Sequence, residues 1–351
     1  MSVPVPDDAV TAMRTEIAQQ PAALRATLEA LMPRGGEAAV LARDCRQVLF
    51  IARGTSDNAA VYGTYLLQAH AGMLATLASP SIATEYHSRM NLSGVLAVAL
   101  SQSGATEEIV ETLAWARDCG ARTLAITNGG GSPLTQVADL AFVTAAGAEL
   151  AVPATKTFTT QLAALAVLAI ALGADLDPGL LRSVPDEIDR MLAAPGEVEP
   201  MVAELTGAGG VVVSGRGHAY AAALELALKL KEACYLHAMG LSWADLLHGP
   251  IAVVDASTPA IIVAAGSGPA LPGSIELARR VVAAGARAYA IGGGPGLAEA
   301  SSLAVPGPQL PEWLAPLGLI VPGQLLTEAL SRRLGIDPDS PRGLSKVTQT
   351  A

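Results

Sequence analysis

Apolar and polar positions form two kinds of segment that follow one another along the chain. Short runs of mostly apolar residues, such as 95–100 and 122–127, predict buried strands. Longer segments with apolar residues at helical spacing lie between such runs and predict helices, for example the segment that ends at Cys119. Strands and helices that alternate in this way indicate an α/β fold with a parallel sheet and helices on both faces.

The same alternation covers the rest of the chain. Further strands are expected at 48–52, 73–78, 140–144, 211–213, 260–265 and 287–291. Further helices are expected at 7–32, with an interruption at Pro21, and at 79–90, 180–192, 198–205, 218–236, 275–284 and 312–334. Two more helices are expected to end at Gln68 and at Ala171.

Two stretches of the chain resemble each other. Residues 48–68 align with 211–231, which places Arg53-Gly54 on Arg216-Gly217. This similarity predicts an internal duplication of about 160 residues, in line with the usual size of a domain. The expected organisation is an N-terminal helical arm (1–36), a first α/β domain (37–195), a second one (196–334) and a C-terminal tail (335–351).

Composition and charge narrow the function. The chain is 51% hydrophobic, and its 22 basic against 32 acidic residues make nucleic acid and anionic membranes poor partners. The longest apolar run, 162–172, is too short to span a bilayer and predicts a buried helix. Three cysteines without metal-ligand spacing favour reduced core thiols. We therefore expect a soluble cytoplasmic protein without a metal or a cofactor.

A turn rich in hydroxyl groups follows the strand 95–100. Ser101, Ser103 and Thr106 surround Gly104 at the carboxyl end of a strand, which is where parallel sheets bind ligands. Several hydroxyls, a close backbone and the start of a helix suit a phosphate group. Helix capping alone is the alternative, and it explains one hydroxyl better than three. The glycine patterns of nucleotide-binding loops are missing from this chain.

The segment 221–250 carries the second candidate. On the predicted helix Glu225, Lys229 and Glu232 share one face, and His248 follows before Gly249-Pro250. A carboxylate beside a lysine, with a histidine on a nearby loop, can move protons between adjacent carbons. The alternative is a ladder of ion pairs on the protein surface, which is a common feature of exposed helices.

Seven motifs follow one another along nearly the whole chain: RGTS (53–56), SQSGAT (101–106), ELAVPATKTFTTQL (149–162), GRG (215–217), ALKLKE (227–232), HGP (248–250) and PRGLSKVTQT (341–350). Together they resemble the double-SIS phosphosugar isomerases, in particular the isomerase half of glutamine–fructose-6-phosphate aminotransferase. The ending GIDPDSPRGLSKVTQT (335–350) is more similar still to the stand-alone glucosamine-6-phosphate deaminases of this fold. The resemblance implies two tandem SIS domains, each a three-layer sandwich of the flavodoxin or Rossmann type.

The resemblance also implies roles for individual residues. Glu232 would move a proton between C1 and C2 of the sugar, with Lys229 beside it. His248, contributed by the partner in a homodimer, would assist ring opening, and Lys346 matches a lysine that can form a Schiff base with a ketose. The expected sugar-phosphate contacts are Thr55, Ser56, Ser101, Gln102, Ser103, Thr106 and the Val152 backbone.

The expected activity is conversion of glucosamine 6-phosphate to fructose 6-phosphate and ammonia, independent of glutamine, because no segment before Val48 is long enough for a glutamine-hydrolysing domain. Ala154 replaces a serine of the aminotransferase, and residues 244–247 also differ from those of the aminotransferase, so the substrate contacts at both places are expected to differ. Three alternatives remain at this stage: a deglycase for sugar–amino-acid adducts, an isomerase of non-aminated sugar phosphates, and a sugar-phosphate sensor without catalytic activity.

Overall fold

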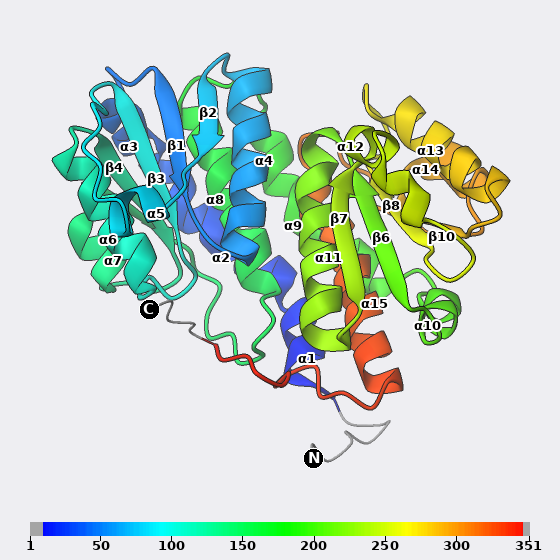
Figure 1. The fold of residues 1–351 in the computed structure, drawn as a ribbon. Coiled ribbons are helices and arrows are strands. Elements are labelled where there is room, and N and C mark those ends of the chain that lie inside the picture. Colours follow the sequence, from blue (N-terminus) through cyan, green and yellow to red (C-terminus); the bar gives the residue numbers. More distant parts are fainter. Residues whose placement is uncertain (1–9, 347–351) are drawn as a thin grey trace. The chain divides into compact units, whose positions relative to one another are not determined.

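The computed structural model describes residues 10–346, so parts of the predicted arm and tail, 1–9 and 347–351, lie outside the described residues. The described chain forms two compact units, each built on one sheet (Figure 1). The β1–β5 unit comprises residues 22–149, 156–183 and 345–346. The β6–β10 unit comprises residues 10–21, 150–155 and 184–344.

The β1–β5 unit has a five-stranded parallel sheet in the order β2-β1-β3-β4-β5. Its strands are β1 (Gln47–Ile51), β2 (Leu74–Leu77), β3 (Val95–Leu100), β4 (Arg122–Thr127) and β5 (Leu140–Val143). Its helices are α2 (Gln20–Leu31), α3 (Gly35–Leu41), α4 (Thr55–His70), α5 (Ser81–Thr84), α6 (Glu107–Asp118), α7 (Pro133–Val137) and α8 (Lys156–Ala171). The first two residues of α2 belong to the other unit.

The β6–β10 unit has a second parallel sheet, in the order β10-β9-β8-β6-β7. Its strands are β6 (Gly210–Gly215), β7 (His237–Ser242), β8 (Ala260–Ala264), β9 (Ala288–Gly292) and β10 (Leu303–Val305). Its helices are α1 (Ala12–Ala18), α10 (Glu199–Leu205), α11 (Tyr220–Cys234), α12 (Trp243–Leu247), α13 (Leu271–Ala283), α14 (Gly294–Glu299) and α15 (Ala315–Arg333), and α9 (Pro178–Ala193) runs from one unit into the other.

The two sheets have the same topology, which confirms the predicted duplication. Read from its opposite edge, the second sheet is β7-β6-β8-β9-β10, so β6 corresponds to β1, β7 to β2 and β8 to β3. The aligned segments 48–68 and 211–231 fall on β1–α4 and on β6–α11. The predicted α/β fold with parallel sheets between helices is therefore confirmed.

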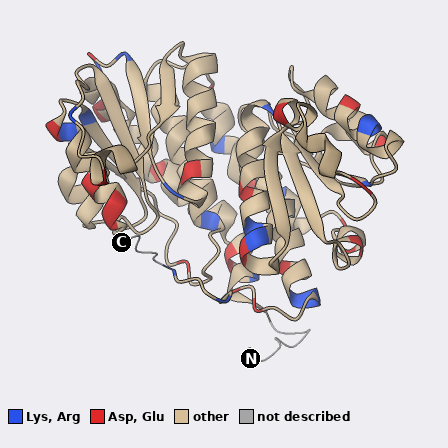
Figure 2. Cartoon of the chain, viewed as in Figure 1, with Lys and Arg blue, Asp and Glu red and all other residues tan. Residues whose placement is uncertain are grey.

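Burial explains why the central strand β3 is apolar throughout. Every residue of β3 is buried, because α6 packs on one face of the sheet and α4 on the other. Figure 2 shows the same contrast, with charged residues on helices and loops and strands that are almost entirely tan. The helix α8 is buried over most of its length, as predicted, and no helix within residues 10–346 is long and apolar enough to cross a membrane.

The thiols lie inside the units. Cys45 and Cys234 are buried, Cys119 is half-buried, and all three are free. Burial raises the pKa of Cys234 to about 12, so this thiol stays protonated at neutral pH.

Some predicted elements differ from the structure. The helix predicted at 79–90 is wrong beyond Thr84, because α5 has one turn and the chain then turns through His87 with a φ of 46°. The strands β7 and β10 were not predicted. The residues of β7 are partly exposed and lack the continuous apolar run that marked the other strands.

Gly63 tests the packing of the β1–β5 unit. A Cβ at this helical position would lie 2.7 Å from Phe50 Cζ and 2.9 Å from a methyl carbon of Leu165. We expect Gly63→Ala to lower the free energy of unfolding by about 1–3 kcal/mol because of overpacking. Gly36→Ala is the matched control, since a Cβ there meets nothing within 4 Å, and it should be neutral or slightly stabilising. Urea unfolding measures both, and equal effects would contradict the tight contact.

Candidate active site

The predicted hydroxyl-rich turn follows β3 in the β1–β5 unit. Ser101 is buried, and its Oγ lies 3.3 Å from Thr106 Oγ1. The Gly104 N–H donates to Ser101 Oγ at 3.2 Å, and the Ala105 N–H donates to Ser103 Oγ at 3.2 Å. Thr106 precedes α6 but makes no side-chain cap bond. The hydroxyls therefore shape the turn, and helix capping does not explain them.

Gly104 is the position at which this turn requires a glycine. Its φ is +65°, and a Cβ there would lie 2.1 Å from Ser132 Oγ. Ser132 Oγ is itself buried and lacks a hydrogen-bond partner among the described residues. It adds a hydroxyl beside the turn that the sequence analysis missed, although its place in the Gly-rich segment after β4 was a usable signal.

The end of β1 lies beside this turn, as predicted, because β1 and β3 are neighbouring parallel strands. Arg53, which follows β1, forms an ion pair of 2.8 Å with Glu108 in the first turn of α6. Thr55 begins α4, and Ser56 is buried and accepts a hydrogen bond of 2.9 Å from Gln161 Nε2. The structure thus gathers the predicted residues of two strand ends at one edge of the sheet.

Gln102 holds the turn through its main chain. Its carbonyl oxygen accepts from the Asn128 N–H at 3.1 Å and from Thr127 Oγ1 at 3.3 Å. The turn after β3 is therefore tied to the end of β4, and the Gln102 side chain is half-buried.

Lys346 pairs with a buried carboxylate that the sequence analysis did not single out. Its Nζ lies 2.9 Å from Glu149 Oε2, and the Glu149 side chain is fully buried. Glu149 also accepts from the N–H of Thr157 at 3.1 Å and from its Oγ1 at 2.6 Å, near the start of α8. Glu149 begins the motif 149–162, but its partner lies 197 residues away and local spacing cannot show it.

In the β6–β10 unit, the three predicted charges of α11 form one connected group. Lys229 Nζ lies 3.3 Å from Glu225 Oε1 and also contacts Glu232 Oε2. Lys229 and Glu225 are 1% and 0% exposed, whereas the Glu232 side chain is 23% exposed. The alternative of a surface ladder is therefore wrong. Glu232 is the member of the group that a substrate can reach.

Opposing effects act on the buried lysine. Burial disfavours the charged ammonium and is the largest single influence, but the two carboxylates outweigh it and raise the pKa of Lys229 above its ordinary value. The lysine is thus charged at neutral pH, and it holds Glu232 in one orientation.

The end of α11 is fixed by the C-terminal segment of the same unit. Tyr235 ends the helix in a left-handed conformation with a φ of 54°. Its Oη accepts from the Arg342 N–H at 2.7 Å, and the Arg342 guanidinium lies 4.3 Å from the centre of its ring. Two residues before Tyr235, the Ala233 carbonyl accepts a hydrogen bond of 2.9 Å from Ser331 Oγ of α15. These contacts position the helical turn that carries Glu232.

Val152 lies in a short segment whose N–H groups donate hydrogen bonds to Glu16 and Asp339. The Glu16 carboxylate accepts from the N–H groups of Leu150 and Ala151. The Val152 N–H donates to the Asp339 carbonyl at 2.9 Å. The predicted backbone contact of Val152 with a sugar must therefore use a group other than this N–H.

His248 stands apart from the charged group of α11. It follows α12, its N–H donates to the Asp245 carbonyl at 3.1 Å, and its side chain is exposed. Among the described residues, no hydrogen bond or ion pair joins His248 to Glu232 or Lys229. Within the same residues, no group of three or more His, Cys, Asp or Glu side chains is placed to hold a metal ion.

The chemistry of these groups is acid–base and anion binding. A half-buried carboxylate fixed by a lysine can take up and return a proton. A turn of hydroxyls and backbone N–H groups at the carboxyl end of a parallel sheet can hold an anion. The turn belongs to the β1–β5 unit, and Glu232 belongs to the β6–β10 unit.

Comparisons with known proteins agree with the duplicated fold. A family model described as "SIS domain" matches residues 41–171 and 204–301, one region for each sheet and together more than half of the chain. An isomerizing glutamine–fructose-6-phosphate aminotransferase from Photorhabdus laumondii subsp. laumondii is 34% identical over 358 residues. The alignment covers 95% of this chain and 58% of the relative, so the chain spans little more than half of that protein's length.

Two solved structures are similar over almost the whole chain. The C-terminal domain of glucosamine-fructose-6-phosphate aminotransferase from Francisella tularensis has a TM-score of 0.82 at 28% identity, covering 96% of this chain and all of that one. Glucosamine-6-phosphate deaminase from Thermotoga maritima has a TM-score of 0.79 at 22% identity, covering 97% and 100%. The second likeness concerns the fold alone.

The pairing of Lys229 with Glu225 in α11 can be tested by measuring the free energy of unfolding of variants. Lys229→Met leaves Glu225 buried without its cation, so we expect the free energy of unfolding to fall by about 3–5 kcal/mol. Lys231→Met, two residues away and exposed, should change it by less than about 0.5 kcal/mol. The double variant Glu225→Gln/Lys229→Met should recover much of the loss. Equal effects of the two lysine substitutions in urea unfolding would disprove the pairing.

Proposed function

The chain belongs to the SIS-domain family, and from this premise we propose that it converts glucosamine 6-phosphate and water to fructose 6-phosphate and ammonia. The relative aligned over 95% of the chain is an aminotransferase named for fructose 6-phosphate and for isomerisation. The direction of ammonia release rests on the resemblance of residues 335–350 to the stand-alone deaminases. The 34% identity with a relative named for isomerisation supports phosphosugar isomerase chemistry.

The charged group of α11 carries the proposal. An isomerisation between C1 and C2 needs one base that takes a proton from one carbon and returns it to the next. Glu232 is 23% exposed at the end of a buried ion pair, so it combines access with a fixed orientation. A surface ion pair would hold the carboxylate much less firmly.

In the proposed reaction, the open aldehyde form of glucosamine 6-phosphate loses its C2 proton to Glu232. The resulting enolamine takes that proton back at C1, and one proton of the amino group passes to O1, which leaves a hydroxyl at C1 and an imine at C2. Water adds to C2, the C–N bond breaks, and ammonia leaves with the remaining proton. The products are fructose 6-phosphate and ammonia, with no oxidant or reductant required.

Binding of the substrate phosphate is assigned to the turn after β3. Ser101, Gln102, Ser103 and Thr106 would hold the phosphate through hydroxyls and backbone N–H groups. Thr55, Ser56 and the Val152 backbone would contact the sugar hydroxyls. Lys346, paired with Glu149 at 2.9 Å, is assigned to transient imine formation with the ketose. Anchoring the phosphate keeps the reacting carbons in place and thereby supports the rate.

His248 is assigned to ring opening, and we propose that a second copy of the chain supplies it in a homodimer. Its exposed side chain is compatible with a role across a subunit interface. Mixing two inactive variants, Glu232→Gln and His248→Ala, tests this arrangement. Recovery of activity in the mixed dimers supports it, and no recovery contradicts it.

An assay of released products separates the candidate activities. The protein is incubated with glucosamine 6-phosphate, with a fructosamine-type 6-phosphate, and with fructose 6-phosphate plus glutamine. Ammonia from the first supports the proposal. Amino acid from the second identifies a deglycase, glucosamine 6-phosphate from the third identifies an aminotransferase, and no turnover of any of them contradicts the proposed reaction.

Glu232→Gln should lower kcat by about 10²–10⁴-fold and leave KM for glucosamine 6-phosphate nearly unchanged, because the amide cannot act as a base. The matched control is Glu276→Gln, an exposed glutamate on α13, which should keep full activity. Steady-state ammonia release gives both constants. Near-normal turnover of Glu232→Gln would remove this residue from the mechanism.

Thr106→Val should raise KM for glucosamine 6-phosphate about tenfold or more. The substitution removes one hydroxyl but keeps the shape, and a hydrogen bond to a charged group contributes about 1.5–3 kcal/mol. Thr76→Val on the exposed part of β2 serves as the control. An unchanged KM would show that this hydroxyl does not contact the phosphate.

A further inference from the structure

A carboxylate lies at the carboxyl end of the second sheet, in the place where two glycine loops meet. Glu312 precedes α15 and reaches back to the loops that follow β6 and β8. A Cβ at Gly217 would lie 2.9 Å from Glu312 Oε1, and one at Gly268 would lie 2.2 Å from Glu312 Oε2. The carboxylate is thus in contact with the backbone of both loops, one oxygen toward each.

The β1–β5 unit shows how the corresponding position looks without a carboxylate. β6 corresponds to β1, so Gly217 corresponds to Gly54, and the two glycines have similar φ values of +61° and +57°. A Cβ at Gly54 would meet no atom within 4 Å. The space beside Gly54, in the loop after β1, is therefore open, whereas Glu312 occupies the space beside Gly217, in the loop after β6.

The loop after β8 has also lost most of the hydroxyls of its counterpart. Residues 265–270 follow β8 as 101–106 follow β3, and Ser267 is their single hydroxyl residue, against Ser101, Ser103 and Thr106 in the other loop. Glycines remain on either side of Ser267, so the backbone can still approach a ligand closely.

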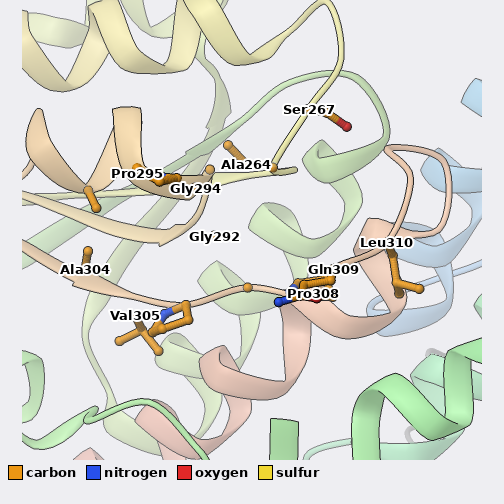
Figure 3. A pocket seen from close by; sticks show the side chains of 15 residues that line it. Ala264, Ser267, Gly292, Gly294, Pro295, Ala304, Val305, Pro308, Gln309 and Leu310 are labelled. Carbon is orange, nitrogen blue, oxygen red and sulfur yellow. The ribbon is translucent and has the colours of Figure 1, made fainter. Parts of the chain in front are cut away.

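Space for a small molecule adjoins this loop. A cavity of about 640 Å³ lies at the carboxyl ends of β8, β9 and β10, within the range of small-molecule sites. Figure 3 shows Ser267 and Gln309 with the small side chains around the cavity. Its lining contains no charged side chain. The β6–β10 unit therefore has room for a ligand at the position where parallel sheets bind one.

Beside this cavity, the charge of Glu312 decides which ligand the two glycine loops accept. The Glu312 side chain is 18% exposed, and its burial raises the pKa of the carboxyl. His218 Nδ1 lies 3.9 Å from Glu312 Oε1. A carboxylate held between the two loops repels an incoming anion and also fills part of its space.

We propose that Glu312 is a specificity-determining residue that excludes phosphate and phosphorylated ligands from the ligand position of the β6–β10 unit. Its carboxylate takes the place of the bound anion, and the duplicated loops keep a backbone that can bind one when the carboxylate is removed. This inference goes beyond the proposed function, because it concerns the other copy of the duplicated unit.

Phosphate titration of the isotope-labelled 351-residue chain, followed by the backbone amide signals of residues 217, 266–268 and 270, tests the proposal. Inorganic phosphate is added at constant ionic strength to the wild-type protein, to Glu312→Ala and to Glu276→Gln, which removes the same charge from an exposed site. Saturable shifts of these signals are expected in Glu312→Ala and not in the other two. The amide signals of residues 101–106 report the other loop separately, so failure of the proposed function gives a different result.

Glu312→Gln guards against a loss of folding, since it keeps the shape of the side chain. It should show the same shifts at higher phosphate concentrations, because only the charge has been removed. Saturable shifts in the wild-type protein would overturn the proposal. The absence of shifts in both Glu312 variants, with an unchanged melting temperature, would overturn it as well.

Discussion

The positive charge buried in α11 is the constraint on which the candidate site depends. An ammonium group that is 1% exposed is stable only if carboxylates and good geometry compensate for its lost hydration. Glu225 supplies a fully buried partner, and Glu232 supplies one that still reaches solvent. The same pairing that keeps the lysine charged also restricts Glu232 to one place, and a base that moves a proton between two carbons needs that restriction.

The two copies of the duplicated unit share one sheet topology but carry different polar groups. When the alignment of 48–68 with 211–231 is continued by one residue, the positions of Glu225, Lys229 and Glu232 correspond to Tyr62, Leu66 and Ala69 of α4. The helix of the β1–β5 unit therefore has no ionic group there, whereas that unit alone carries the hydroxyl-rich turn. In the other copy, the Glu312 carboxylate lies against the two loops at the carboxyl end of the sheet. The hydroxyl-rich turn and the buried charged group thus lie in different copies of the duplicated unit.

Much of the fold was predictable because both sheets are covered on two faces, and buried parallel strands give continuous apolar runs. The bounds of β3 and β4 agree with the prediction residue by residue. The partly exposed β7 gave no such run, and Pro80 favoured a helix start that only one turn of α5 follows. Periodicity located the face shared by Glu225 and Lys229 but not its burial, which depends on the packing of α15 against α11.

The parts of the site that escaped prediction are held by partners distant in sequence. The Glu16 carboxylate accepts from the Leu150 N–H. The main-chain carbonyl of Asp339 accepts from the Val152 N–H, and its carboxylate accepts from the first N–H groups of α1. Such bonds leave no local pattern, because the carboxylate and the N–H group meet only after the chain has folded. They also explain why the C-terminal segment belongs to the site. Arg342 holds Tyr235 at the end of α11, so the turn that carries Glu232 takes its shape from residues more than a hundred positions away.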